Sequence, residues 1–258
     1  MRPSRSRRLL PGLFAGVLAV AVAPTVAAVA VAPTVAAAPA SSYQLDLGRR
    51  TDYVGQTNLV QCVGASVQMM LNMMSSRDDR TAATQLRLQK LARAWSGPSR
   101  NGRIRQGASV RGWAKALTIE GAGPYQVVGK DTVQEALLTA ARAMRTTGRP
   151  VGLLLWRGRH AWVMSGFRST KDPLLPGARV TAAIVEDPLH SFGESTTWGR
   201  SPRPGEAVSI GELSTQFVRR RQSSFTPSLS GKFVIVLPFE IDQRTLRLHG
   251  LPASPTQG

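Results

Sequence analysis

The period of the apolar residues changes near Pro150, and this change constrains the fold more than any other feature of the chain. Before Pro150, apolar residues recur at helical spacing; after it, they form short continuous runs typical of buried strands. Helices are predicted over residues 61–74, 81–95, 109–117, 131–148 and 209–217, and strands over 125–128, 150–156, 160–167, 181–186 and 232–239. Short connections favour antiparallel neighbours. The sequence therefore predicts an α+β domain, with a helical half followed by a mostly antiparallel sheet.

Two helix starts carry capping signals. Asp131 is expected to cap the helix over 131–148, with Gln134 at the capping-box position, and Gly148 is expected to end it. Ser209 and Glu212 form a second capping box before the short helix over 209–217.

The first forty residues have the pattern of an export signal. Four arginines precede an apolar stretch over residues 9–22, and small residues suitable for cleavage follow. Pro24 and Pro33 interrupt the apolar run, which disfavours a permanent membrane anchor. We therefore predict a signal peptide over 1–40, a folded domain over 41–250, a disordered tail over 251–258, and a secreted bacterial protein without a transmembrane domain in the mature chain.

The chain is strongly basic. Its formal charge of +18 falls to +14 when the four signal arginines are removed. One interpretation is an affinity for anionic polymers of the cell envelope. The other is a genome that encodes arginine more often than lysine, which leaves an ordinary soluble basic surface. Because the basic residues are scattered and aromatic residues are few, specific nucleic-acid binding is not predicted.

Cys62 is the only cysteine, so it cannot form a disulfide within the chain. It is therefore either a small buried apolar residue or a functional thiol. Its position at the start of a predicted helix favours the second interpretation, because the helix dipole stabilises a thiolate there.

Three further residues complete a set suited to thiol hydrolysis. His160, at a strand start, is the candidate base and acid, and Asp187, at the end of the next strand, would orient its ring. Gln56 would provide an oxyanion donor together with the Cys62 backbone N–H. Each also has a structural interpretation: a turn histidine, an aspartate before a proline, and a loop amide.

At these residues the chain resembles the papain-like clan of cysteine peptidases. It is most similar to cysteine peptidase family thirty-nine, which contains the bacteriocin-processing (double-glycine leader) peptidases and stand-alone relatives. The matching segments, in order, are Gln56, residues 62–66, residues 158–166, residues 185–188, Ser209 with Glu212, and residues 233–237. The resemblance departs from the family pattern after the cysteine, where Val63 precedes Gly64, and residues 81–123 have no counterpart.

The resemblance implies a papain-like fold and a secreted cysteine peptidase acting on a peptide or protein substrate. Cys62, His160, Asp187 and Gln56 would be its catalytic residues, with no cofactor. No spacing typical of a zinc, calcium or phosphate site is present in the sequence.

Three other interpretations remain open. The same residue types serve transglutaminase-like domains, although those place the histidine closer to the cysteine. They also suit an amidase or acyl transferase acting on cell-wall peptides. The third is a catalytically inactive papain-like binding module. Trp162 is expected in the core, whereas Trp156 and Trp198 are candidates to line a groove, and His190 and His249 are expected in surface loops.

Overall fold

An antiparallel sheet organises the part of the chain that the computed structural model describes, residues 42–75, 77–98, 106–196, 198–222 and 226–240. Its seven strands are β1 (Tyr43–Asp46), β2 (Tyr125–Lys130), β3 (Val151–Leu155), β4 (His160–Ser169), β5 (Val180–Glu186), β8 (Glu206–Ser209) and β9 (Phe233–Pro238). Their order is β2-β9-β3-β4-β5-β8, and β1 pairs with the second half of β4. The proposed signal peptide, the tail over 251–258 and His249 lie outside the described residues.

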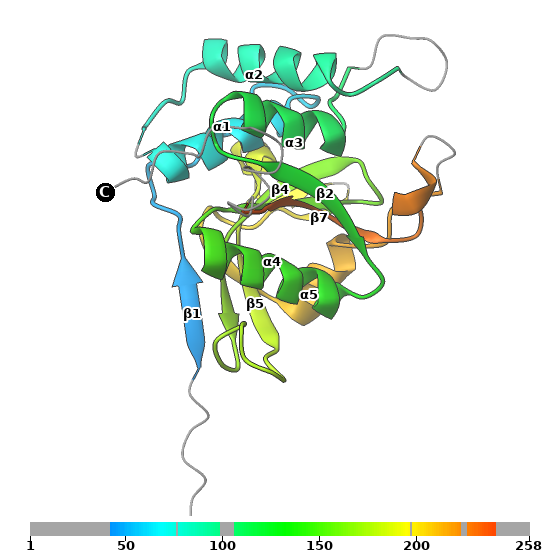
Figure 1. Ribbon diagram of the computed structural model, residues 1–258. Helices are drawn as coiled ribbons and strands as arrows, with labels where there is room; N and C mark the ends of the chain where they lie inside the picture. Colours follow the sequence, from blue (N-terminus) through cyan, green and yellow to red (C-terminus); the bar gives the residue numbers. More distant parts are fainter. Residues whose placement is uncertain (1–41, 76, 99–105, 197, 223–225, 241–258) are drawn as a thin grey trace, which may run out of the picture. The chain divides into compact units, whose positions relative to one another are not determined.

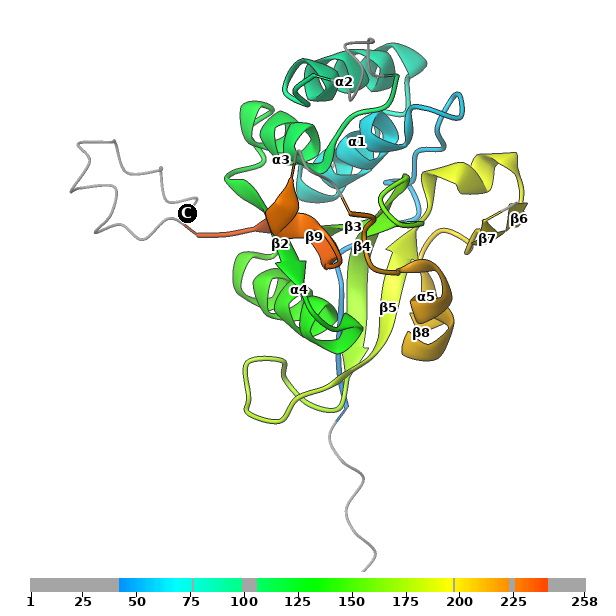
Figure 2. The same cartoon turned by 90° about the vertical axis from the view of Figure 1, so that its right-hand side faces the viewer.

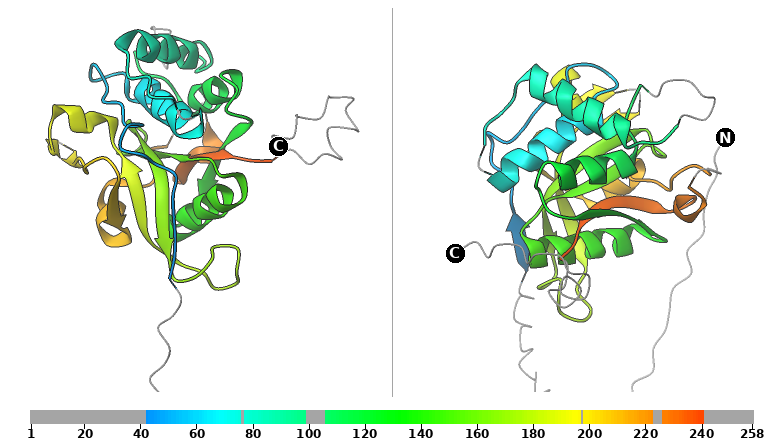
Figure 3. Two further views of the ribbon diagram at one scale, coloured as in Figure 1. Left: turned by 90° about the vertical axis from the view of Figure 1, so that its left-hand side faces the viewer. Right: turned by 45° about the horizontal axis from the view of Figure 1, so that its top comes forward.

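Helices cover both faces of this sheet (Figures 1 and 2). They are α1 (Cys62–Ser75), α2 (Ala82–Ala94), α3 (Val110–Ile119), α4 (Val133–Thr147) and α5 (Ile210–Gln216). The 3-10 helices η1 (Pro188–Phe192) and η2 (Pro227–Leu229) and the hairpin β6 (Ser195–Thr196) and β7 (Gly199–Arg200) complete the described elements. Helices α1, α2 and α3 lie on one face, and α4 lies on the other (Figure 3). The predicted order, N-terminal helices followed by a mostly antiparallel sheet, is confirmed.

The two faces of β4 belong to two separate hydrophobic cores. Ala161 and Val163 pack with residues of α1, α2 and α3, whereas Trp162 and Met164 pack with residues of α4 and α5. This is the alternation expected of a strand buried on both sides. Trp162 is fully buried, as predicted.

Some local predictions were wrong. Thr132, and not Asp131, caps α4, and the capping box uses Glu135 in place of Gln134. The prediction assigned the cap one residue too early, because both Asp and Thr suit the position. Gly148 ends α4 in the left-handed conformation, as predicted. Residues 41–54 and 189–205, where the sequence predicts no helix or strand, contain β1, most of η1 and the β6–β7 hairpin, which are too short to give a periodic signal.

None of the helices in the described ranges is both long and apolar enough to cross a membrane.

Candidate active site

Cys62 is the first residue of α1 and is partly exposed. The first backbone N–H groups of a helix have no acceptor within the helix, so side chains or ligands must satisfy them. The Gln89 side chain does this for Gly64, accepting from its N–H at 2.9 Å. One turn further on, the Ser66 hydroxyl lies 3.5 Å from the carbonyl oxygen of Ala161 on β4. The start of α1 is thus held against the strand that begins with His160.

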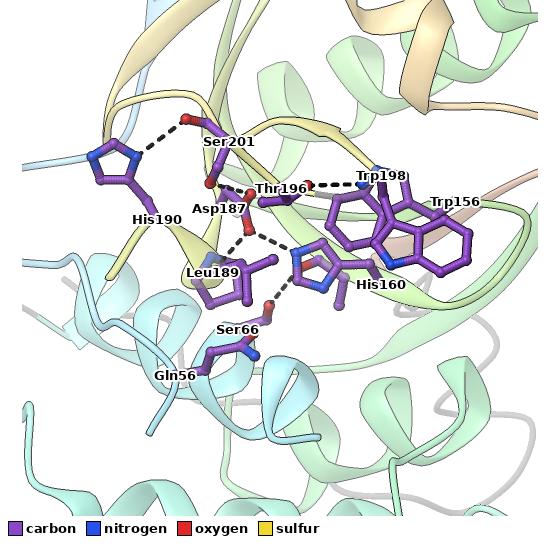
Figure 4. A network of polar contacts seen from close by, with 12 residues as sticks. Gln56, Ser66, Trp156, His160, Asp187, Leu189, His190, Thr196, Trp198 and Ser201 are labelled. Atoms are coloured by element: carbon purple, nitrogen blue, oxygen red, sulfur yellow. Dashed lines mark hydrogen bonds and ion pairs between the residues drawn. The ribbon is translucent and has the colours of Figure 1, made fainter. Parts of the chain in front are cut away.

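His160 lies beside both of its predicted partners. Its Nε2 lies 2.7 Å from Oδ1 of Asp187 (Figure 4), and the Cys62 side chain is near enough to raise the pKa of the ring. Because Asp187 occupies Nε2, we assign Nδ1 to the sulfur. The structure therefore brings together three residues that are far apart in the sequence.

The ring of His160 is protonated at neutral pH. Burial alone would lower its pKa, but hydrogen bonds to Asp187 and Cys62, together with their charges, outweigh burial and raise the pKa to about 9. The ring is then an imidazolium at neutral pH. A cationic imidazole beside a thiol is the environment from which thiol nucleophiles act.

Asp187 is fully buried, and its carboxylate accepts three hydrogen bonds. Besides His160, the Leu189 N–H donates to Oδ1 at 2.8 Å, and the Ser201 hydroxyl donates to Oδ2 at 2.5 Å. The Leu189 bond makes Asp187 the cap of η1, so the aspartate before a proline is both a turn signal and a site residue. Ser201, which is also fully buried, was not predicted, because a serine in a polar loop carries no distinguishing signal.

His190 is half-buried rather than a free surface residue. Its Nδ1 lies 3.2 Å from the carbonyl oxygen of Ser201, the residue whose hydroxyl bonds to Asp187.

Gln56 is buried near the start of α1 and is tied to the Asp187 loop. Its backbone N–H donates to the Pro188 carbonyl at 2.8 Å, and its Nε2 donates to the Asn58 carbonyl at 2.8 Å. A side-chain amide carries two N–H donors, so one remains beyond the Asn58 bond. This second N–H is the donor that the predicted oxyanion role of Gln56 requires.

Helix α2 holds the loop that carries Gln56 and leads to Cys62. The Gln85 side chain bonds to the Gly55 carbonyl at 2.9 Å and to the Thr57 N–H at 2.8 Å. The Gln89 side chain bonds to the Val60 carbonyl at 2.9 Å in addition to Gly64. Both glutamines are buried. Residues 82–94 have no counterpart in the family that the sequence resembles. In this chain they support the cysteine loop, residues 55–61, which leads to Cys62.

The ring of Trp156 stacks against the ring of His160. The two rings stack with centroids 4.3 Å apart and planes 17° apart. Trp156 and Arg157 adopt positive φ angles of 52° and 59° in the turn between β3 and β4. The indole N–H of Trp156 donates to Gln216 at 3.1 Å, which fixes the ring in place.

Glu186, which precedes Asp187, is a buried acid that the sequence analysis did not single out. Burial raises its pKa to about 8, even though the Gly205 backbone and the Ser165 side chain make hydrogen bonds to it. An ordinary glutamate has a pKa of 4.5, so between these values the folded chain holds a proton that the unfolded chain releases. His160 acts in the same direction between 6.5 and about 9. The free energy of unfolding should therefore fall as pH rises across this range.

Replacing Glu186 with glutamine should reduce this fall in the free energy of unfolding with pH. At pH 5 the Glu186→Gln variant and the natural protein should have similar stability, because the carboxyl group is then neutral in the fold. At pH 8.5 the variant should be more stable by about 1–3 kcal/mol, since no buried charge forms. Urea unfolding from pH 5 to 8.5 measures this difference, and parallel pH profiles for the two proteins would contradict the assignment.

No group of three or more potential metal ligands occurs among the described residues. A cavity of about 990 Å³ lies elsewhere, lined mainly by residues of α3, β2 and the segment around η2, and none of Gln56, Cys62, His160 and Asp187 lines it.

Comparison of the sequence with models of known protein families and with curated proteins finds no match. The site is therefore interpreted from its own geometry.

Proposed function

We propose that the protein is an exported cysteine peptidase that hydrolyses peptide bonds through an acyl-thioenzyme on Cys62. The observation that carries the proposal is the His160 ring, which pairs with the buried Asp187 at 2.7 Å and lies beside the Cys62 side chain. The resemblance to papain-like peptidases supports it, as does the order of helices and sheet. The signal-like residues 1–40 support action outside the cell.

The chemistry follows from the three residues. The Cys62 thiolate attacks the carbonyl carbon of the peptide bond, a C–S bond forms, and the carbonyl oxygen becomes an oxyanion. The Cys62 backbone N–H and the second Gln56 N–H would stabilise that oxyanion. His160 gives its proton to the leaving nitrogen as the C–N bond breaks. Water then attacks the thioester, His160 takes a proton from that water, and the acid product leaves the regenerated thiolate.

Labelling of the thiol tests this proposal directly. An epoxide-type thiol-protease inhibitor should add once to the mature protein at neutral pH under reducing conditions. Because Cys62 is the only cysteine, mass spectrometry of the intact chain assigns the adduct. We expect the rate to exceed that of glutathione by at least about 10²-fold and to fall by a similar factor in the His160→Gln variant.

The second half of the test identifies the bond that is cleaved. The labelled and unlabelled proteins are incubated in parallel with casein and with peptidoglycan fragments. New peptide termini in casein that labelling abolishes would support a peptidase. Cleavage of the peptidoglycan fragments alone would replace it with a cell-wall amidase, and a Cys62 thiol no more reactive than glutathione would reject both.

A further inference from the structure

Trp198 is a large apolar side chain that remains 53% exposed beside the candidate site. It lies in the turn of the β6–β7 hairpin, where its backbone N–H donates to the Thr196 hydroxyl at 3.2 Å. The same hydroxyl donates to the Gly199 carbonyl at 2.6 Å and closes the turn. Exposing an indole forgoes the favourable burial of a large apolar surface, so its position calls for a reason.

The exposed ring is the outer end of a column that begins at His160. Trp156 stacks on His160, and Trp198 stacks on Trp156 with centroids 6.1 Å apart and planes 24° apart (Figure 4). The Arg159 guanidinium lies 4.7 Å from the centroid of the Trp198 ring. This arrangement connects the candidate acid-base group to an exposed aromatic surface.

The framework that presents Trp198 is built from buried contacts. Gln216, which is buried, accepts from the Trp156 indole at 3.1 Å and donates to the Arg200 carbonyl at 2.8 Å. It thereby joins both tryptophan-bearing segments. A Cβ on Gly199 would lie 2.7 Å from Oε1 of Gln216, so only glycine fits there, and its φ of 138° also requires glycine.

The hairpin is also fixed from its other side. The Arg200 side chain forms ion pairs at 2.5 Å with both Glu206 and Glu212. The exposed indole is thus held in place before any substrate arrives. Such preorganisation lowers the entropic cost of binding.

The position of the column relates it to one side of the substrate. His160 must touch the leaving nitrogen in order to protonate it, so the part of the substrate beyond that nitrogen lies next to the imidazole. Trp198 extends this surface away from the ring. We propose that Trp198 forms a subsite for an aromatic or large apolar side chain on the leaving-group side of the scissile bond, with Arg159 as a positioning residue for the indole. This inference rests on the proposed function of Cys62 and His160.

A pair of small alkylating probes tests the subsite without a known substrate. Both iodoacetamide and 2-iodoacetanilide alkylate a thiolate with loss of iodide. The anilide carries a phenyl ring on its amide nitrogen, where a leaving group would extend. We expect the rate ratio of anilide to amide at Cys62, divided by the same ratio for glutathione, to be about 10 or more in the natural protein.

The variants separate binding from folding. Trp198→Ala should reduce the normalised ratio to about 1–2, whereas Trp198→Phe should retain most of the preference. Trp95→Ala is the matched control, because Trp95 is 47% exposed and also has a cation over its ring, Lys115 at 4.8 Å. Its ratio should match that of the natural protein.

The outcomes also distinguish this inference from the proposed function. A normalised ratio near 1 in the natural protein, or a preference that survives Trp198→Ala, would overturn the subsite. Failure of the proposed function appears separately, as an absolute iodoacetamide rate equal to that of glutathione and unaffected by His160→Gln.

Discussion

The Asp187→Asn variant is expected to lose peptide hydrolysis by about 10- to 10²-fold while remaining folded, because the charge that stabilises the imidazolium is lost. In the natural protein the Asp187 carboxylate accepts from the His160 ring, the Leu189 N–H and the Ser201 hydroxyl. Asparagine has nearly the same shape but offers only one acceptor oxygen and adds two donors. Its oxygen can take the place of Oδ1 and its NH₂ can donate to the Ser201 hydroxyl, but the negative charge beside His160 is lost.

The loss follows from the missing charge and, where the amide is reversed, from the position of the ring proton. If the asparagine NH₂ faces His160, Nε2 must accept, and the neutral ring then carries its proton on Nδ1. Nδ1 is the nitrogen that we assign to the sulfur, so it can no longer take the thiol proton. Removing the Asp187 charge also removes one of the contacts that raise the pKa of His160. The ring of the variant should therefore lose much of its positive charge near pH 7.

The rate of Cys62 alkylation, followed from pH 5 to 10, measures this effect apart from substrate binding. The natural protein should lose the protonated ring as pH passes about 9, which removes the acid needed for hydrolysis. Asp187→Asn should slow the alkylation of Cys62 near pH 7. Asp172→Asn is a matched control, because Asp172 pairs with Arg145 at 3.3 Å on the surface, away from His160. Identical profiles for Asp187→Asn and the natural protein would show that Asp187 does not orient the ring.

Elements with a long apolar pattern lie close to their predicted bounds. The helix predicted over 61–74 is observed as Cys62–Ser75, and the strand predicted over 181–186 as Val180–Glu186. Both are long enough for their burial pattern to repeat. By contrast, β1 and β8 each have four residues and take their places through pairing with β4 and β5. Such pairing is a tertiary effect that a local pattern does not contain.

The candidate site was predictable for residues whose chemistry is unusual for their position. A lone cysteine at a helix start and a histidine at a strand start are such residues, and the structure brings Cys62 and His160 together. The supporting residues were not predictable. Ser201, Gln85 and Gln89 are common polar residues, and only the fold places their hydrogen bonds on Asp187 and on the cysteine loop.

Gly64 connects the fold to the site, and its replacement by alanine should have the largest effect of any methyl-sized change near Cys62. A Cβ at this position would lie 2.7 Å from the Gln85 carbonyl oxygen and 2.9 Å from the Gln89 Cβ. The first contact is with helix backbone, which cannot rotate away, so α2 must move from α1. This close approach explains why residue 64 is a glycine.

We expect Gly64→Ala to lower the free energy of unfolding by about 2–3 kcal/mol, because the clash outweighs the better helix propensity of alanine. It should also slow Cys62 alkylation about tenfold, since displacing α2 moves the Gln85 and Gln89 side chains that hold the loop before the thiol. Gly211→Ala provides a matched comparison. Gly211 lies in α5, and a Cβ added there would have no neighbour within 4 Å. The same substitution should therefore raise the free energy of unfolding by about 0.5–1 kcal/mol.

Chemical denaturation and the alkylation rate, measured on both glycine variants, separate packing from propensity. Opposite signs in stability, with slower alkylation confined to Gly64→Ala, would mean that the α1–α2 contact sets the position of the thiol. Equal stabilisation by both substitutions would mean that α2 adjusts freely. In that case the glutamine contacts of α2 would not fix the loop before Cys62, and the reactivity of Cys62 would depend on its proximity to His160 alone.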